Sequence, residues 1–238
     1  MSLLRTVRAV GDTARITVPT VAAALVGRVT LERSDERLDW WARKLLDDAG
    51  VELEVEGREL VPPDEPLVLM SNHRSYYDIP TVFCAVPGRI RMVAKKELFR
   101  VPLFGRAMLA AGFIKVDRGK RESAIESIKE SEQLLKQGVR VWIAPEGTRS
   151  HTGELGEFKS GGFHLALDAG VRILPIAIEG TENVLSADSL SVQRGAKVRA
   201  KILPPIDAPA YGKERRKELT AAVRAAIATA LGQTVSST

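Results

Sequence analysis

Apolar residues recur at steps of three or four over residues 2–27, which is the spacing of one helix face. The stripe is formed by Leu4, Val7, Val10, Ala14, Val18, Val21 and Leu25. Arg5, Arg8 and Arg15 lie on or beside the other face, an arrangement typical of a helix in a membrane interface. The uncharged run that ends this stretch is shorter than the roughly 20 apolar residues that a membrane span needs.

Two alternatives stay open for this stretch. Arginines ahead of an apolar run with three alanines also occur in secretory signal peptides, although these alanines lie inside the run rather than after it. A helix that packs on the rest of the protein would show a similar stripe. We expect the interfacial helix.

A second helical stripe follows, formed by Leu38, Trp41, Ala42, Leu45 and Ala49. Ser34 is the expected N-cap, because Asp35 and Glu36 would then occupy the first turn, and Gly50 is the expected stop. Residues 1–50 are therefore predicted to form a membrane-associating pair of amphipathic helices, a helical hairpin.

Beyond residue 50 the pattern alternates between short apolar runs and helical stripes. The predicted strands are residues 51–56, 67–71, 90–95, 112–116, 139–144, 171–178 and 197–203. One predicted helix begins near residue 78, and the others cover residues 98–111, 122–137, 161–169 and 213–231. This alternation predicts an α/β domain over residues 51–231, with a mixed, largely parallel sheet flanked by helices. Residues 232–238 are expected to be a disordered tail.

The net charge of +5 is unevenly distributed. Residues 87–121 contain ten basic residues and only two acidic ones, Glu97 and Asp117. Such a local excess favours an anionic partner, although a solvated basic face is the alternative. An aromatic content of 5% argues against binding of single-stranded nucleic acid, which uses stacking platforms.

Several common site signatures are missing from the sequence. The single cysteine, Cys84, excludes a disulfide framework and a cysteine-rich zinc site. The chain has no P-loop, no dinucleotide-binding glycine pattern and no Gly-x-Ser-x-Gly. The other two histidines, His151 and His164, have no ligand spacing to His73 that indicates zinc. We expect no metal and no cofactor.

His73 and Asp78 follow the buried run 67–70 directly. Five steps place the two side chains far apart on one helix, so they meet only if His73 lies on a turn and Asp78 begins the next helix. In that arrangement the carboxylate orients the imidazole, which then acts as a general base. Asn72 and Ser75 are suited to brace the turn. A purely structural His–Asp pair is the alternative.

A second chemical stretch, residues 144–150, follows another predicted buried strand. Its proline and glycine indicate an irregular loop that places Glu146 and Arg149 at the sheet edge, where open α/β sheets bind ligands. The planar fork of arginine suits phosphate. A third stretch, residues 95–118, has basic residues at both ends and could line a groove for an anion and an acyl chain. Taken singly, residues 144–150 would be a turn with a surface salt bridge. Residues 95–118, taken singly, would be a basic surface.

Together the three stretches resemble the glycerolipid acyltransferase family, in particular its bacterial 1-acylglycerol-3-phosphate (lysophosphatidic acid) acyltransferases. The first family block matches Asn72, His73 and Asp78. The second matches Lys96, Glu97, Leu98, Pro102, Gly105, Gly112, Asp117 and Arg118. The third matches residues 145–150 and the fourth residues 173–176, around Pro175. Ala144 departs from the family, which usually has phenylalanine there.

The resemblance implies an enzyme that transfers an acyl chain from acyl-CoA or acyl-carrier protein to the sn-2 hydroxyl of lysophosphatidic acid. His73 would be the base and Asp78 its orienting partner. The implied substrate-binding residues are Lys96, Arg118, Glu146, Gly147, Thr148 and Arg149. The implied supporting residues are Asn72, Ser75 and Pro175.

The implied partners are a phospholipid membrane surface, lysophosphatidic acid and the acyl carrier, with no nucleic acid. The expected location is peripheral, on the cytoplasmic face of the cell membrane. Three alternatives remain: an acyltransferase for another lysophospholipid or a lyso-aminolipid, a non-catalytic lipid-binding protein with the same fold, and a thioester hydrolase.

Overall fold

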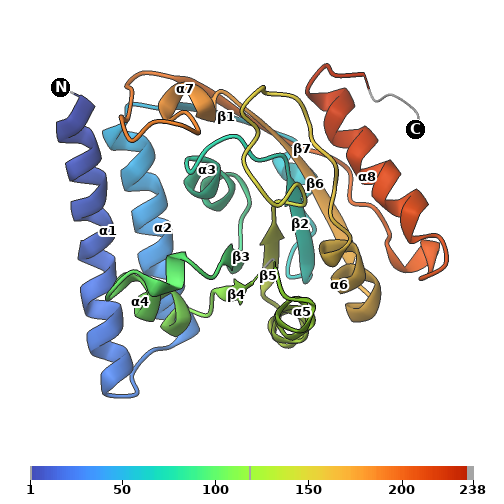
Figure 1. The fold of residues 1–238 in the computed structure, drawn as a ribbon, viewed down its shortest axis with the longest axis horizontal. Coiled ribbons are helices and arrows are strands. Elements are labelled where there is room, and N and C mark those ends of the chain that lie inside the picture. The colour runs from blue at the N-terminus through green and yellow to red at the C-terminus, as the bar shows by residue number, and fades with distance from the viewer. Residues whose placement is uncertain (1, 118, 235–238) are drawn as a thin grey trace.

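The computed structural model describes residues 2–117 and 119–234, and within them a seven-stranded sheet lies between layers of helices (Figure 1). The strands are β1 Glu52–Glu56, β2 Leu67–Ser71, β3 Ile90–Lys95, β4 Ile114–Val116, β5 Arg140–Ile143, β6 Arg172–Glu179 and β7 Lys197–Ile202. Their order is β1-β7-β6-β2-β5-β3-β4, and only the β6–β7 pair is antiparallel. The predicted mixed, largely parallel sheet is confirmed, and the ends of the seven predicted strands differ by at most two residues.

The helices cover both faces of the sheet. They are α1 Ser2–Leu25, α2 Leu31–Asp48, α3 Asp78–Ala85, α4 Phe104–Ala110, α5 Arg121–Lys136, α6 Gly161–Ala169, α7 Thr181–Val184 and α8 Arg216–Ala230. Short 3₁₀ helices cover Arg58–Leu60, Leu98–Arg100 and Pro209–Tyr211. One core cluster joins the sheet to α2, α3 and α4, and a second joins its other face to α5, α6 and α8 (Figure 1).

The central strand β2 explains where a site forms. All five of its residues are buried, because helices cover it on both faces and β5 and β6 pair with it on either side. Both neighbours run parallel to β2, so the carboxyl ends of the three strands meet at one edge of the sheet. That edge is where ligands bind in open α/β sheets.

The structure corrects two local predictions. The N-cap of α2 is Thr30 rather than Ser34: the Thr30 hydroxyl accepts a hydrogen bond from the Arg33 N–H at 3.3 Å, and Ser34 is buried one turn inside the helix. The helix predicted over residues 98–111 is interrupted before α4. Val101 precedes a proline and adopts an extended conformation, as that position favours.

The segment between β6 and β7 contains α7, which the sequence did not predict. Gln233 belongs to the segment predicted to be a disordered tail, and that disorder stays a prediction. Gln233 accepts a hydrogen bond from the Leu155 N–H at 2.9 Å and donates one to the Gly153 carbonyl at 2.8 Å. Residues 235–238 of the predicted tail lie outside the described residues.

Helix α1 attaches to the rest of the protein through polar contacts. The Thr13 hydroxyl accepts from the Trp41 indole N–H at 3.0 Å, and the Thr20 hydroxyl accepts from Arg37 at 2.9 Å. Most of the predicted apolar stripe faces outward instead. Its exposed large members are Leu4, Val7, Val10, Val18 and Leu25, whereas Val21 is buried. The stripe is therefore not the main surface that holds α1 in place.

No helix among residues 2–117 and 119–234 is both long and apolar enough to cross a membrane. Helix α1 packs against both α2 and α4, and the exposed apolar residues Leu103 and Leu109 lie beside and within α4. Exposed apolar side chains therefore belong to two neighbouring elements of the structure.

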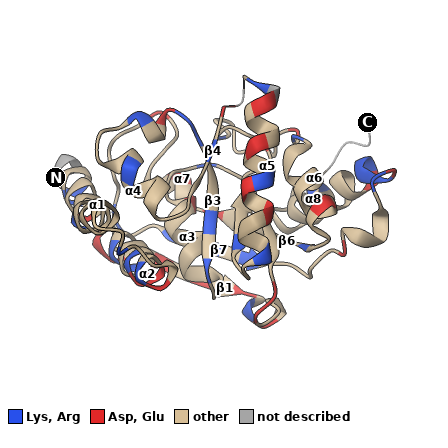
Figure 2. Ribbon diagram, turned by 90° about the horizontal axis from the view of Figure 1, so that it is seen from below, with Lys and Arg blue, Asp and Glu red and all other residues tan. Residues whose placement is uncertain are grey.

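The predicted basic excess is partly neutralised inside the fold. Arg91 is fully buried and pairs with Asp35 of α2 at 2.6 Å, and Arg89 pairs with the same carboxylate at 3.2 Å. Other basic side chains of the region remain exposed: Lys95, Arg100, Arg106, Lys115 and Lys120. Figure 2 shows basic positions on α4 and beside β4, whereas α5 carries charges of both signs.

Candidate active site

The turn that leaves β2 joins His73 to Asp78. His73 lies on the turn and Asp78 is the first residue of α3, as the sequence spacing required. The His73 Nδ1 and Asp78 Oδ2 atoms are 2.7 Å apart. A carboxylate only accepts hydrogen bonds, so Nδ1 carries the proton and Nε2 is left as the basic nitrogen.

The Asp78 carboxylate is fixed from several directions. Its Oδ2 atom also accepts hydrogen bonds from the backbone N–H groups of Arg74 at 2.8 Å and Ser75 at 3.0 Å. Its Oδ1 atom accepts one from the Thr181 hydroxyl at 2.5 Å. The Asp78 residue is completely buried, so these donors take the place of water.

Asn72 and Ser75 tie the turn to the sheet and to the segment after β6. The Asn72 side-chain amide donates to the Ile178 carbonyl and accepts from the Ile178 N–H, both at 2.8 Å, as a neighbouring strand would. The Ser75 hydroxyl donates to the Leu185 carbonyl at 2.6 Å and accepts from the Tyr77 N–H at 3.1 Å. Both residues thus occupy the bracing positions that the sequence indicated.

Trp142 of β5 packs against the His73 ring, a contact that the sequence did not predict. Its indole N–H donates to the Ser71 hydroxyl at 3.0 Å, and its ring meets the His73 ring edge-on, with 6.4 Å between ring centroids. The His73 side chain is 16% exposed, so the imidazole is supported on one side and partly open on another. The available signal was an aromatic residue in the strand just before the 144–150 loop.

Glu146 and Ser150 hold the His73 backbone from the loop after β5. One Glu146 oxygen accepts from the His73 N–H and the other from the Gly156 N–H, both at 2.8 Å. The Ser150 N–H donates to the His73 carbonyl at 2.7 Å. Burial raises the pKa of the Glu146 carboxyl above its ordinary value. The observed contacts of Glu146 are those of a brace, and its expected role in substrate binding stays a prediction.

Arg149 lies at the same edge with spare hydrogen-bonding capacity. Its guanidinium carbon lies 4.1 Å from the centroid of the Tyr76 ring, in a cation–π contact. Its Nη1 atom is buried without a hydrogen-bond partner among the described residues. A guanidinium that contacts an aromatic ring and keeps an unsatisfied donor is suited to receive an anionic oxygen.

The loop also borders a pocket of about 310 Å³. Its lining includes Glu146, Thr148, Ser150, Gly156 and Lys159. Gly147 has a φ of +75° between Glu146 and Thr148, which allows the loop to turn there. Thr148 therefore lies beside an open space, and the binding roles of Gly147 and Thr148 stay predictions.

The remaining predicted site residues have different surroundings. Lys96 follows β3 and forms an ion pair with Asp117 at 2.5 Å. Pro175 is buried in β6, in register with Met70 of β2, and its carbonyl accepts from the Leu203 N–H at 3.0 Å. Arg118 lies outside the described residues. The substrate-binding roles of Lys96 and Arg118 stay predictions.

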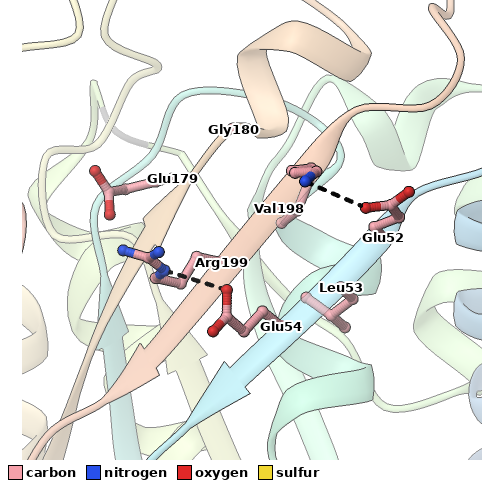
Figure 3. Close-up of a pocket in the computed structure, with 8 residues that line it drawn as sticks. Glu52, Leu53, Glu54, Glu179, Gly180, Val198 and Arg199 are labelled. Atoms are coloured by element: carbon pink, nitrogen blue, oxygen red, sulfur yellow. Dashed lines mark ion pairs between the residues drawn. The ribbon is translucent and has the colours of Figure 1, made fainter.

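A second pocket, of about 460 Å³, lies on the surface of β1 and β7 (Figure 3). Exposed ion pairs line it: Lys197 with Glu52 at 3.9 Å, and Arg199 with Glu54 at 3.5 Å. Its lining includes neither the His73 turn nor the 144–150 loop. The edge around His73, rather than this pocket, is therefore the candidate site.

Within residues 2–117 and 119–234, no group of three or more His, Cys, Asp or Glu side chains could hold a metal ion. The expectation of no metal and no cofactor stays a prediction. What the geometry provides is an oriented imidazole with one free nitrogen, next to a partly unsatisfied guanidinium. That combination suits proton removal from a hydroxyl group of an anionic substrate.

The chain is similar to known acyltransferases. Residues 52–179 match the family model described as Acyltransferase. The chain is 38% identical over 158 residues to 1-acyl-sn-glycerol-3-phosphate acyltransferase alpha of Mus musculus, covering 66% of this chain and 55% of that protein. It is 35% identical over 158 residues to 1-acyl-sn-glycerol-3-phosphate acyltransferase of Escherichia coli (strain K12), covering 66% of this chain and 63% of that protein.

The matches thus span about half to two thirds of the length of these relatives. Among solved structures, the chain resembles the 1-acyl-sn-glycerophosphate (LPA) acyltransferase PlsC from Thermotoga maritima, with a TM-score of 0.74 and 23% identity. That likeness covers 99% of this chain and 100% of the other, and it shows a shared fold.

Proposed function

The chain belongs to the Acyltransferase family, and on that basis we propose that it is a 1-acyl-sn-glycerol-3-phosphate O-acyltransferase. It transfers an acyl chain from a thioester, acyl-CoA or acyl-carrier protein, to the sn-2 hydroxyl of lysophosphatidic acid and forms phosphatidic acid. The observation that carries this proposal is the fixed His73–Asp78 pair beside Arg149 at one sheet edge. Relatives whose names specify this reaction support the choice of acceptor.

The proposed chemistry uses His73 as a general base. Nε2 removes the hydroxyl proton while the hydroxyl oxygen attacks the thioester carbonyl carbon. The carbon–sulfur bond then breaks, and the imidazolium returns the proton to the departing thiolate. Asp78 keeps Nδ1–H in place and stabilises the imidazolium through its 2.7 Å hydrogen bond. A positioned base of this kind typically contributes about 10²–10⁴-fold to the rate.

Arg149 is the proposed anchor for the acceptor phosphate. Tyr76 lies in the His73–Asp78 turn and contacts the guanidinium, so the anchor and the base share one short segment. The buried unsatisfied Nη1 gains a partner when a phosphate oxygen binds, which offsets the cost of leaving that donor unpaired. The acceptor hydroxyl is thereby held near the base by its phosphate end.

Membrane association is proposed to involve α1 and α4. The outward stripe lies on α1, and the exposed leucines Leu103 and Leu109 lie beside and within α4, which packs against α1. An apolar face with flanking basic residues is typical of interfacial helices. This arrangement supports peripheral attachment, which we assign to the cytoplasmic face of the membrane, where the acyl donors are found.

Exposed basic residues near the same sheet edge support an anionic acyl donor. Lys95 ends β3 and Lys115 lies in β4, both with exposed side chains. These strands run parallel to β5, so their carboxyl ends lie at the edge that carries His73. Coenzyme A and acyl-carrier protein are both anionic, and a positive surface would attract either of them.

The reaction is tested by product analysis with purified protein, an acyl-CoA or acyl-carrier protein donor, and a panel of lysolipids. We expect mass spectrometry to detect phosphatidic acid acylated at sn-2, with lysophosphatidic acid preferred over lysophosphatidylcholine and lyso-aminolipids. Preference for an uncharged or zwitterionic acceptor would contradict the phosphate role of Arg149. Thiol release without any acceptor would indicate a hydrolase, and no transfer at all would indicate a lipid-binding protein.

Replacement of Arg149 by alanine is expected to raise the KM for lysophosphatidic acid by about 10–100-fold, because it removes charge-assisted hydrogen bonds to phosphate. The KM for the thioester is expected to stay unchanged. The KM of Arg149→Lys for lysophosphatidic acid should lie between those of the wild type and Arg149→Ala, since lysine keeps the charge but loses the planar fork. Lys129→Ala, on the exposed surface of α5, is the charge control. An effect of Arg149→Ala confined to donor kinetics would refute the assignment.

The α1 stripe is tested with Val10→Glu, at a valine that is 64% exposed. We expect binding to phosphatidylglycerol–phosphatidylethanolamine vesicles to weaken by roughly 10-fold or more, because a buried apolar contact with lipid is replaced by a charge. Thermal unfolding should be unaffected, since the side chain does not pack in the protein. Ile125→Glu, at an exposed isoleucine of α5, is the matched control. Equal vesicle binding by wild type and Val10→Glu would rule out this role for the stripe.

A further inference from the structure

The two oxygens of the Asp78 carboxylate have different partners. Oδ2 accepts from His73 and from two backbone N–H groups, whereas Oδ1 accepts from the Thr181 hydroxyl at 2.5 Å. Both Asp78 and Thr181 are completely buried. Because a carboxylate has no hydrogen to give, the hydroxyl is the donor. Thr181 lies beyond the matched residues 52–179 and outside the motif stretches.

The chain reaches Thr181 through a turn that only glycine allows. Gly180 follows β6 with a φ of +89°, and a Cβ atom there would lie 2.1 Å from the Lys197 carbonyl oxygen. Figure 3 shows Gly180 between the end of β6 and the short helix α7. The turn ends the strand at the sheet edge that carries His73 and makes Thr181 the first residue of α7.

The same segment holds the turn at two further points. Glu182 pairs with Arg74 at 3.0 Å, and the Leu185 carbonyl accepts from the Ser75 hydroxyl at 2.6 Å. Thr181 differs from these two in that its hydroxyl binds the carboxylate itself. Residues 181–185 therefore contact the His73–Asp78 turn at three points. One of these contacts, from Thr181, is to the Asp78 carboxylate, which orients the His73 ring.

We propose that Thr181 is a positioning residue for acyl transfer: its hydroxyl fixes the rotation of the Asp78 carboxylate, so that Oδ2 stays aligned with His73 Nδ1. This role rests on the proposed function, because it concerns the alignment of the base in that reaction. Without the hydroxyl, a buried anionic oxygen lacks a donor. The carboxylate then rotates toward other donors or admits water, and the imidazole loses its fixed orientation.

The first test compares Thr181→Val, which keeps the side-chain shape without the donor, with Thr181→Ser, which keeps the donor. We expect kcat to fall by about 10–100-fold in Thr181→Val, the usual size of a hydrogen bond to a charged group. The KM values for lysophosphatidic acid and the thioester should stay unchanged, because substrate contacts are intact. Thr181→Ser should recover most of kcat. Thr181→Ala serves as a second hydroxyl-free variant if the valine variant does not fold.

Thr81→Val is the matched control. Thr81 is also a completely buried threonine, and its hydroxyl donates to the Tyr77 backbone carbonyl at 2.8 Å rather than to a carboxylate. Thermal unfolding of both variants measures the loss of a buried hydroxyl. We expect Thr81→Val to lose stability without a drop in kcat of the folded protein. Equal kcat losses in the two variants would show that Thr181 has only a structural role.

The second test is independent of substrate. Proton NMR of the free protein detects the low-field His73 Nδ1–H resonance, which we expect to shift in Thr181→Val and to stay in place in Thr81→Val. An unshifted resonance together with unchanged kcat in Thr181→Val would overturn the proposal. If the resonance shifts but the wild type transfers no acyl chain to lysophosphatidic acid, the proposed function fails and the alignment by Thr181 stands.

Discussion

A completely buried carboxylate is costly unless donors surround it, and the Asp78 side chain sets this requirement for the whole site. Four donors meet it: the His73 ring, the backbone N–H groups of Arg74 and Ser75, and the Thr181 hydroxyl. Three of them come from the turn after β2, and the fourth arrives from β6 through Gly180. The conformation of the turn and the path of the chain after β6 therefore both supply donors to the Asp78 carboxylate. In the proposed mechanism the base is therefore oriented before any substrate arrives, so little reorganisation is needed during the reaction.

The parallel strands explain why this turn lies beside Arg149, the proposed anion-binding group. The carboxyl ends of β2 and β5 meet at one edge, and the loop after β5 holds the His73 backbone on both sides, through Glu146 at its N–H and Ser150 at its carbonyl. Arg149 lies between these two braces in sequence, and its guanidinium lies over the Tyr76 ring of the turn. The base and the proposed phosphate anchor thus belong to segments that are braced against each other.

Sequence predicted the parts of this arrangement that depend on local spacing. The five positions from His73 to Asp78, directly after a strand, required a turn at His73 and a helix that begins at Asp78. Both are present. The sequence did not predict the parts that depend on contacts between distant segments. The four-residue helix α7 is too short to show a periodicity, so Thr181 gave no signal. Periodicity also found the α1 stripe without showing which face packs, because the attachment uses hydroxyl groups such as that of Thr13.

The most direct test of the central claim is the rate of phosphatidic acid formation by folded His73→Ala, compared with His164→Ala on α6 as the histidine control. The account predicts that loss of the oriented base lowers the rate by about 10²–10⁴-fold, with the variant still folded and the control variant as active as the wild type. Turnover by His73→Ala near the wild-type rate would contradict the proposal that His73, held by Asp78, removes the acceptor proton.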